Sequence, residues 1–271
     1  KNDLHWVTKR VLQIGRNWPV SPYPGDSNRD WYSRFWIQLA TGISMMTNPL
    51  LDLLFPRLCA VCGSRLQSDE THLCLHCLRH LPRTDFHKES EHAMEQLFRG
   101  KIDIDRAFAF FYSTPHSQYR RLLHHIKYHN GKECARYLGK LYAEELCETG
   151  LLDDIDLIIP VPLHRTRMRK RGYNQSEWIA LGISDITGIT LDTQSLIRPK
   201  ANPSQTHLSL YERWLNTHNI FSLSPNHNCT DKHILLVDDI VTTGATLLAC
   251  AQTLRTAQPR NISLLALSFA Q

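Results

Sequence analysis

Short apolar runs alternate along this chain with longer segments whose apolar residues recur at helical spacing. We expect strands at residues 106–112, 155–161, 234–237 and 262–269. We expect helices at residues 117–128, 133–148, 174–186 and 245–255. Because strands that alternate with helices form parallel sheets covered on both faces, the pattern predicts an α/β fold.

The strand Ile234–Val237 runs directly into the carboxylates Asp238 and Asp239, at the strand end where parallel sheets hold their ligands. Carboxylates accept hydrogen bonds from ribose hydroxyls, with or without a bridging Mg²⁺, and are the candidate catalytic pair of a sugar-phosphate site. The next turn and helix start offer N–H groups to a phosphate. The predicted phosphate ligands are Thr242, Thr243, Gly244, Ala245 and Thr246. In the alternative interpretation the acidic pair only caps the helix, which leaves one carboxylate unexplained.

Two Cys-x-x-Cys pairs, Cys59/Cys62 and Cys74/Cys77, are separated by eleven residues. This spacing is typical of a structural zinc site with four thiolate ligands. The alternative is two disulfides or redox pairs. The neighbouring histidines, His72, His76 and His80, are expected to be exposed rather than metal ligands. Of the other cysteines, we expect Cys147 and Cys250 in the core and Cys134 and Cys229 in polar surroundings.

A basic segment follows the strand at 155–161, with five cations and no acid between positions 165 and 171. It predicts an anionic ligand, pyrophosphate or nucleic acid, whereas the alternative is a solvated basic face. The candidate anion ligands are Lys127, Arg165, Arg169 and Arg171. An extended loop would project Arg167, Arg169 and Arg171 to one side, and a helix would scatter them.

Composition adds bounds to this picture. With 271 residues, of which 42% are hydrophobic and 21% charged, the chain can bury an α/β core and a small appendage. It has no apolar run long enough to span a bilayer and no apolar signal-peptide core, so we expect a soluble, cytoplasmic protein. A net charge of +5 permits contact with nucleic acid without requiring it.

Several motifs, in sequence order, resemble the ComF family of phosphoribosyltransferase-like proteins. They are Leu53-Leu54-Phe55-Pro56, Leu81-Pro82, Val161-Pro162, Arg171-Gly172-Tyr173-Asn174-Gln175, then Gln205, Leu208, Arg213 and Asn216, and the Asp238-Asp239 turn. The last resembles the phosphoribosyl pyrophosphate (PRPP) loop of type I phosphoribosyltransferases. The resemblance covers residues 48–268. It implies a type I phosphoribosyltransferase fold with a small N-terminal four-Cys zinc module, and PRPP with Mg²⁺ as ligand.

The resemblance also implies a role in DNA uptake during natural transformation, with single-stranded DNA and a DNA-uptake helicase as partners. The residues leave two functions open. One is an active phosphoribosyltransferase that displaces pyrophosphate from PRPP by an acceptor base that no motif selects. The other is a non-catalytic adaptor that binds PRPP and single-stranded DNA or a protein, with Tyr119, Tyr128 and Tyr173 as candidate stacking residues. A PRPP-sensing regulator is a third alternative, but no helix-turn-helix signature is present.

We divide the chain into residues 1–45, a zinc-knuckle module at 46–84 and a phosphoribosyltransferase-like domain at 85–271. Residues 1–45 contain four of the six tryptophans but no pattern that would bury them. We expect them to be disordered, or a non-native extension ahead of a start at Met46 or Met45; the alternative is a tail that docks on a partner. Residues 205–216 are our candidate for a mobile lid.

Overall fold

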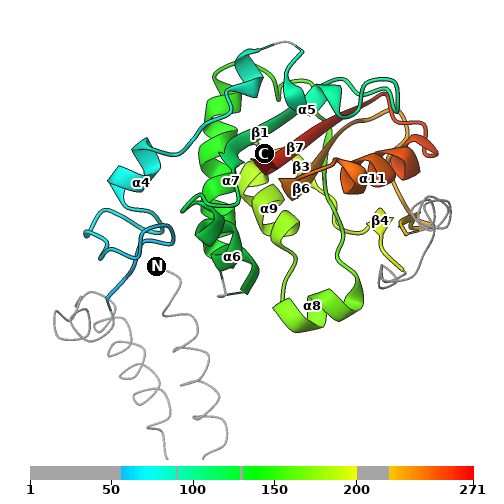
Figure 1. Cartoon of the computed structure of the whole chain (residues 1–271). Helices are drawn as coiled ribbons and strands as arrows, with labels where there is room; N and C mark the ends of the chain where they lie inside the picture. Colours follow the sequence, from blue (N-terminus) through cyan, green and yellow to red (C-terminus); the bar gives the residue numbers. More distant parts are fainter. Residues whose placement is uncertain (1–55, 90, 129–130, 200–219) are drawn as a thin grey trace, which may run out of the picture. The chain divides into compact units, whose positions relative to one another are not determined.

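In the computed structural model, five parallel strands form the central sheet, in the order β1-β7-β6-β2-β3 (Figure 1). Their bounds are Ala107–Ser113 for β1, Leu157–Pro160 for β2, Thr190–Leu191 for β3, His233–Val241 for β6 and Asn261–Ala270 for β7. A separate antiparallel pair consists of β4, Leu196–Ile197, and β5, Ser222–Leu223. The sheet confirms the predicted α/β class.

The structure describes residues 56–89, 91–128, 131–199 and 220–271. The predictions for residues 1–45 and for the lid at 205–216 lie outside these ranges. The stretch Leu58–Gln271 is one compact unit, and the proposed boundary after residue 84 stays a prediction. Among the described helices, none combines the length and the apolar character needed to cross a membrane.

Helices cover both faces of the sheet. The longer ones are α6, Arg120–Tyr128, α7, Lys132–Cys147, α9, Gln175–Thr187, and α11, Ala245–Arg255. The chain leaves β1 and β2 in one direction along the sheet, through α7 and α9, and leaves β6 in the other direction, through α11. Because such crossovers are right-handed, α7 and α9 lie on one face and α11 on the other (Figure 1).

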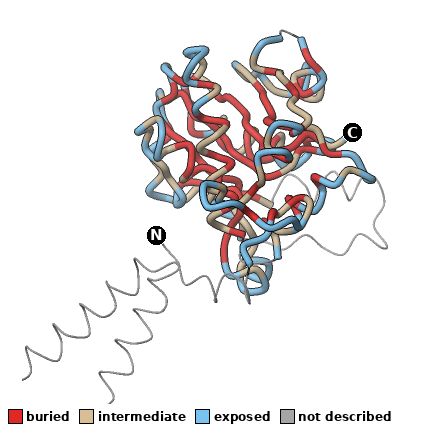
Figure 2. The backbone as a smooth tube through the Cα atoms, turned by 90° about the vertical axis from the view of Figure 1, so that its left-hand side faces the viewer, coloured by how far each residue is buried: buried red, intermediate tan, exposed pale blue. Residues whose placement is uncertain are grey.

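The core lies between the sheet and these helices. Strands β6 and β7 are buried along almost their whole length (Figure 2). Helices α7 and α9 pack closely because a glycine stands at each point of contact. A Cβ added at Gly139 would lie 2.3 Å from the carbonyl oxygen of Ile179, and one at Gly182 would lie 2.1 Å from that of Arg136. This contact fixes the position of α9 beside the carboxyl end of β2.

Shorter elements lie before β1 and after β2. They are α4, Leu75–Arg79, the 3₁₀ helix η1, Phe86–Lys88, α5, Ala93–Gln96, and α8, Arg165–Arg171. The basic segment is therefore the helix α8 and not an extended loop. His164 caps its start by accepting from the N–H of Thr166, and Gly172, in the left-handed conformation, ends it.

Three of the four predictions for the isolated cysteines are wrong. Cys134 and Cys229 are buried, whereas Cys147 is exposed; Cys250 is buried as predicted. Cys134 has polar neighbours in sequence, but it lies on the face of α7 that is turned to the core, whereas Cys147 is the last residue of that helix. The packing of the helix, and not the nearest residues in the chain, decides burial at these positions.

Candidate functional site

The strands β2 and β6 separate at the carboxyl edge of the sheet. The two strands pair only as far as Pro160 and Val237, while β6 continues beside β7 to Val241. From this point the chain turns through α9 on one face and through α11 on the other. Parallel sheets bind ligands where the strand order reverses in this way. The geometry therefore selects this edge independently of any motif.

Asp238 and Asp239 lie at this edge, inside β6 rather than after it as the sequence indicated. Pairing with β7 extends the strand by four residues beyond Val237. The hydroxyl of Ser176, in the first turn of α9, donates to Asp238 Oδ1 at 3.0 Å, and the N–H of Asp239 donates to the same oxygen at 2.9 Å. The ammonium of Lys127, in α6, lies 3.0 Å from Asp239 Oδ2. The pair is nearly buried, with 8% and 9% of the residue surface exposed.

The carboxyl group of Asp238 has a raised pKa. Burial, and then the charge of Asp239, raise the pKa of Asp238 from 3.8 to about 7. The ammonium of Lys127 lies beside Asp239. The carboxylate oxygens of the pair can accept hydrogen bonds from hydroxyl groups or bind a divalent cation, either of which would favour the ionised form of Asp238.

We expect the contribution of Asp238 to the stability of the unliganded protein to fall as the pH rises from about 4 to about 7. Because the pKa of Asp238 is higher in the folded chain, its proton stabilises the fold below about pH 4, and this contribution disappears as the pH passes about 7. The variant Asp238→Asn should be more stable than the wild type at about pH 8, by an amount on the order of a few kcal/mol, and the two should converge at about pH 4. Urea unfolding across this pH range measures the difference. A constant difference at every pH would contradict the assignment.

The turn after β6 presents exposed groups over a buried glycine. Thr242, Thr243, Ala245 and Thr246 are exposed, and Gly244 is buried. Gly244 caps α11 with φ +73°, in the left-handed region that favours glycine. A Cβ there would lie 3.0 Å from Cζ of Phe98, the second residue after α5. The segment at 93–98 therefore packs against the buried side of the turn, and the threonine residues of the turn remain exposed to solvent.

The variant Gly244→Ala should destabilise the protein by about 2–3 kcal/mol, because left-handed strain of about 1–2 kcal/mol adds to the collision with Phe98. Gly188→Ala is the matched control, since Gly188 has φ +72° and an added Cβ there would have no neighbour within 4 Å. Gly188→Ala should lower the free energy of unfolding only by the left-handed strain. Urea unfolding of both variants separates the two contributions, and equal losses would show that Phe98 does not constrain the turn.

The predicted anion ligands do not all lie together. Arg171 donates to Gln175 Oε1 at 2.7 Å, and its guanidinium lies 5.5 Å from the ring centre of Tyr128, next to Lys127. Residues four apart share a helix face, so Arg167 and Arg171 lie on one face of α8. Arg165 and Arg169 lie about 200° further round, on another face. The helix thus scatters the cations, and Lys127 is the predicted anion ligand that a described contact brings to the acidic pair.

Two residues of the site were missed by sequence reasoning. Ser176, in α9, donates a hydrogen bond to Asp238, which lies in β6. Arg198 interacts electrostatically with both Asp238 and Arg167. Ser176 directly follows the motif that ends at Gln175, and that adjacency was a usable signal. Arg198 follows β4 and carries no local signal, because only the tertiary fold brings it near β6.

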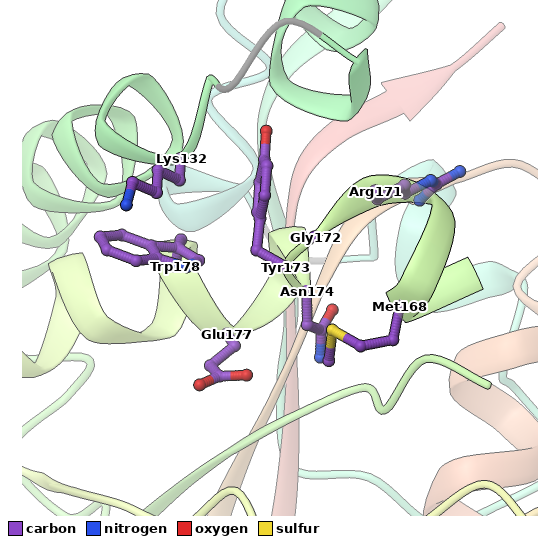
Figure 3. A pocket seen from close by; sticks show the side chains of 8 residues that line it. All are labelled: Lys132, Met168, Arg171, Gly172, Tyr173, Asn174, Glu177 and Trp178. Carbon is purple, nitrogen blue, oxygen red and sulfur yellow. The ribbon is translucent and has the colours of Figure 1, made fainter. Parts of the chain in front are cut away.

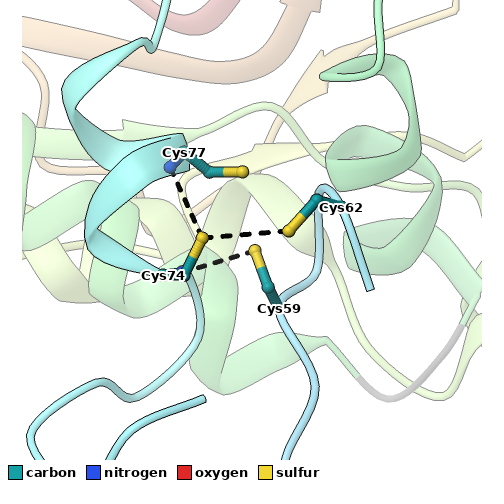
Figure 4. Close-up of side chains that lie close together, drawn as sticks. All are labelled: Cys59, Cys62, Cys74 and Cys77. Carbon is teal, nitrogen blue, oxygen red and sulfur yellow. Dashed lines mark hydrogen bonds between the residues drawn. The ribbon is translucent and has the colours of Figure 1, made fainter. Parts of the chain in front are cut away.

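The four cysteines of the paired motifs converge as predicted (Figure 4). Their sulfur atoms all lie within 4.8 Å of one another, and Cys62 Sγ lies 3.8 Å from Cys74 Sγ. Sulfurs around a tetrahedral zinc ion, each at about 2.3 Å from the metal, are about 3.8 Å apart. The eight cysteines are free thiols, and 3.8 Å is too long for a disulfide, so the disulfide alternative finds no support.

Local hydrogen bonds prepare the cysteine cluster for a cation. The N–H of Cys74 donates to Cys59 Sγ at 3.4 Å, and hydrogen bonds from Ser64 lower the pKa of Cys62 to about 6. Burial raises the pKa of Cys77, as do its cysteine neighbours. Four thiolates this close repel one another unless a metal ion neutralises them, so the donor set fits structural zinc. His76 and His80 are exposed and lie outside the cluster, and His72 is half-buried.

The zinc knuckle is joined to the helical layer. The hydroxyl of Tyr119 donates to the carbonyl of Cys77 at 3.0 Å, and the ring of His72 lies 5.4 Å from that of Tyr137 in α7. Tyr119 is buried, which removes it from the candidate stacking residues. Tyr173 is also nearly buried and donates to the carbonyl of Ile126, whereas Tyr128 is 50% exposed.

Comparison with known proteins gives two domain families. The Phosphoribosyl transferase domain matches residues 135–269, and the Double zinc ribbon domain matches residues 50–87. Among solved structures, glutamine PRPP amidotransferase from B. subtilis is 17% identical, with a TM-score of 0.39 over 61% of this chain and 32% of its own. Hypoxanthine phosphoribosyltransferase from Trypanosoma cruzi is 16% identical, with a TM-score of 0.33 over 50% of this chain and 64% of its own.

Curated relatives give closer matches. DNA utilization protein YhgH of Salmonella typhimurium is 36% identical over 138 residues, which span 49% of this chain and 59% of the relative. The Shigella flexneri protein of the same name is 31% identical over 73% of this chain and 83% of its own length. Competence protein F of Haemophilus influenzae is 31% identical over 73% of this chain and 78% of its own. The chain therefore belongs to the ComF family of phosphoribosyltransferase-like proteins with an N-terminal zinc ribbon.

Proposed function

We propose that this protein binds PRPP together with Mg²⁺ at the carboxyl edge of the sheet, between β2 and β6. Asp238 and Asp239 would hold the two ribose hydroxyls, and Mg²⁺ bound with PRPP would partly neutralise its pyrophosphate. The turn of residues 242–246 holds the 5′-phosphate through its N–H groups and the positive end of α11. The observation that carries the proposal is the paired, nearly buried carboxylates beside this exposed turn, at the point where the strand order reverses.

Lys127 has a second role in this proposal. In the unliganded structure its ammonium neutralises Asp239. Ribose hydroxyls and Mg²⁺ would replace that contact, and the released ammonium would then be beside the pyrophosphate, next to Arg171. Neutralising the leaving pyrophosphate in this way favours a transition state with positive charge on the ribose. The same contacts would also serve a protein that binds PRPP without turnover.

Titration with PRPP and Mg²⁺, followed by a screen for pyrophosphate release with a set of nucleobases, tests the proposal. Saturable binding with pyrophosphate release identifies a phosphoribosyltransferase. Saturable binding without release identifies a PRPP-binding adaptor. The absence of binding at millimolar PRPP contradicts the proposal.

The relatives named for DNA utilization and competence support a role in DNA uptake or use, which we propose for this protein on the cytoplasmic side of the membrane. A single strand of DNA, and through it a helicase of the uptake machinery, is the proposed partner. The observation that favours this role is α8. None of the salt bridges among the described residues involves Arg165, Arg167, Arg169 or Lys170. The exposed ring of Tyr128 lies at the end of this basic surface.

The double variant Arg167→Glu/Lys170→Glu should bind single-stranded DNA at least about tenfold more weakly, and its affinity should depend less on salt. The charge-matched control is Lys88→Glu/Arg99→Glu, whose side chains are 63% and 61% exposed and lie away from α8. Fluorescence anisotropy of a labelled oligonucleotide at several salt concentrations measures both quantities. If both double variants behave alike, α8 is not the DNA surface.

A further inference from the structure

A cavity lies apart from the acidic pair, between the starts of α7 and α9 and the end of α8 (Figure 3). Its volume is about 360 Å³, which lies within the range of small-molecule pockets. It is lined by Lys132, Met168, Arg171, Gly172, Tyr173, Asn174, Glu177 and Trp178. Neither carboxylate of the pair and no residue of the turn at 242–246 contributes to it.

Asn174 gives the cavity a buried acceptor. Its Nδ2 donates to the carbonyl of Val161 at 2.9 Å. Because a carbonyl can only accept, this bond fixes the orientation of the amide and turns Oδ1 away from Val161. The residue is 4% exposed, and Oδ1 is buried without a hydrogen-bond partner among the described residues. Buried polar atoms of this kind are rare unless a water or a ligand meets them, so a hydrogen-bond donor is expected here.

The remaining lining groups are of three kinds. Lys132 and Arg171 are cations on opposite sides of Tyr173, and Glu177 is an acceptor lower in the same cavity (Figure 3). Trp178 offers an aromatic face, over which the ammonium of Lys132 lies at 5.0 Å from the ring centre. Burial raises the pKa of Glu177.

We propose that this cavity binds a nucleoside monophosphate unit. Its phosphate lies toward the ammonium of Lys132, its base packs against Trp178, and its amino or hydroxyl groups donate to Asn174 Oδ1 and Glu177. An inorganic anion would leave both acceptors unsatisfied, and an uncharged base would leave Lys132 without an anionic partner. A nucleotide unit is the simplest chemistry that satisfies all three kinds of group.

The cavity is connected to the surface of α8. The guanidinium of Arg171 lies between the cavity and the exposed ring of Tyr128. A terminal nucleotide of a strand that lies along α8 could therefore enter it, as could a free mononucleotide. Both sources present the same phosphate, sugar and base, and they differ only in whether a chain is attached.

Isothermal titration with the deoxynucleoside 5′-monophosphates, and with 5′-phosphorylated and 5′-hydroxyl oligothymidylates, distinguishes the sources. Mononucleotide binding identifies a free ligand, and binding that requires the phosphorylated oligomer identifies a strand end. In either case Lys132→Ala should weaken binding at least about tenfold. The control Lys140→Ala, on the same helix, should leave it unchanged, since Arg136 still pairs with Asp185 when Lys140 is removed.

The variant Asp238→Asn/Asp239→Asn separates this inference from the PRPP site. It should bind the nucleotide or the phosphorylated oligomer as the wild type does, even though its PRPP site is disabled. Loss of nucleotide binding in this variant would place the nucleotide in the proposed PRPP site and overturn the inference. Binding that is absent altogether, or that is equal in Lys132→Ala and the wild type, would also overturn it.

Discussion

The double variant Asp238→Asn/Asp239→Asn is expected to lose at least about 100-fold in PRPP affinity while its fold is retained. A hydrogen bond to a charged acceptor contributes about 1.5–3 kcal/mol, so two such contacts correspond to two or more factors of ten. The fold should survive because Asn is close in shape to Asp, and because the change removes both the buried charge and the repulsion between the two acids. Isothermal titration with PRPP and Mg²⁺, together with circular dichroism, measures both effects.

The control for this variant is Asp153→Asn/Asp231→Asn. Both side chains are exposed and precede β2 and β6, at the opposite edge of the sheet. This control removes the same charge but should bind PRPP with wild-type affinity. If the control loses as much PRPP affinity as Asp238→Asn/Asp239→Asn, the effect is one of net charge. If Asp238→Asn/Asp239→Asn keeps its PRPP affinity, PRPP is bound elsewhere.

Loss of the metal should have the second large effect, which is local unfolding of residues 58–80, the part of the zinc knuckle that contains the four cysteines. A four-thiolate zinc site contributes about 10–16 kcal/mol in zinc-finger peptides, more than the knuckle could recover from its few buried side chains. Cys77→Ser, or chelation, should therefore remove the metal and expose this segment to protease. Because the backbone carbonyl of Cys77 accepts a hydrogen bond from the hydroxyl of Tyr119, cleavage should be accompanied by loosening at the start of α6.

Cys147→Ser is the matched control, since Cys147 is exposed and lies outside the cluster. It should contain one zinc ion for each chain and resist protease as the wild type does. Metal analysis by mass spectrometry and limited proteolysis provide the two readouts. Wild-type protein that is free of metal and still protected in this segment would contradict the assignment.

The elements and both main motifs were predictable because each depends on residues that are neighbours in sequence. Strand β6 with its acidic pair, and the two Cys-x-x-Cys pairs, place their functional groups within a few residues of one another. The α/β class followed from alternation, since a strand and the next helix can connect in few ways. The extension of β6 through Asp238 and Asp239 was missed because it depends on pairing with β7, a distant segment.

The acidic pair, the threonine-rich turn that follows it and the set of four clustered cysteines were thus determined by the sequence itself, because local spacing brings those groups together. Only the tertiary structure decided the partners of those groups: Lys127 at Asp239, Ser176 at Asp238, and Phe98 beneath Gly244. It also decided that α8 scatters its cations and that a cavity forms at Asn174. These features depend on how helices from distant segments pack on one sheet, and that packing is specified by the whole core rather than by adjacent residues.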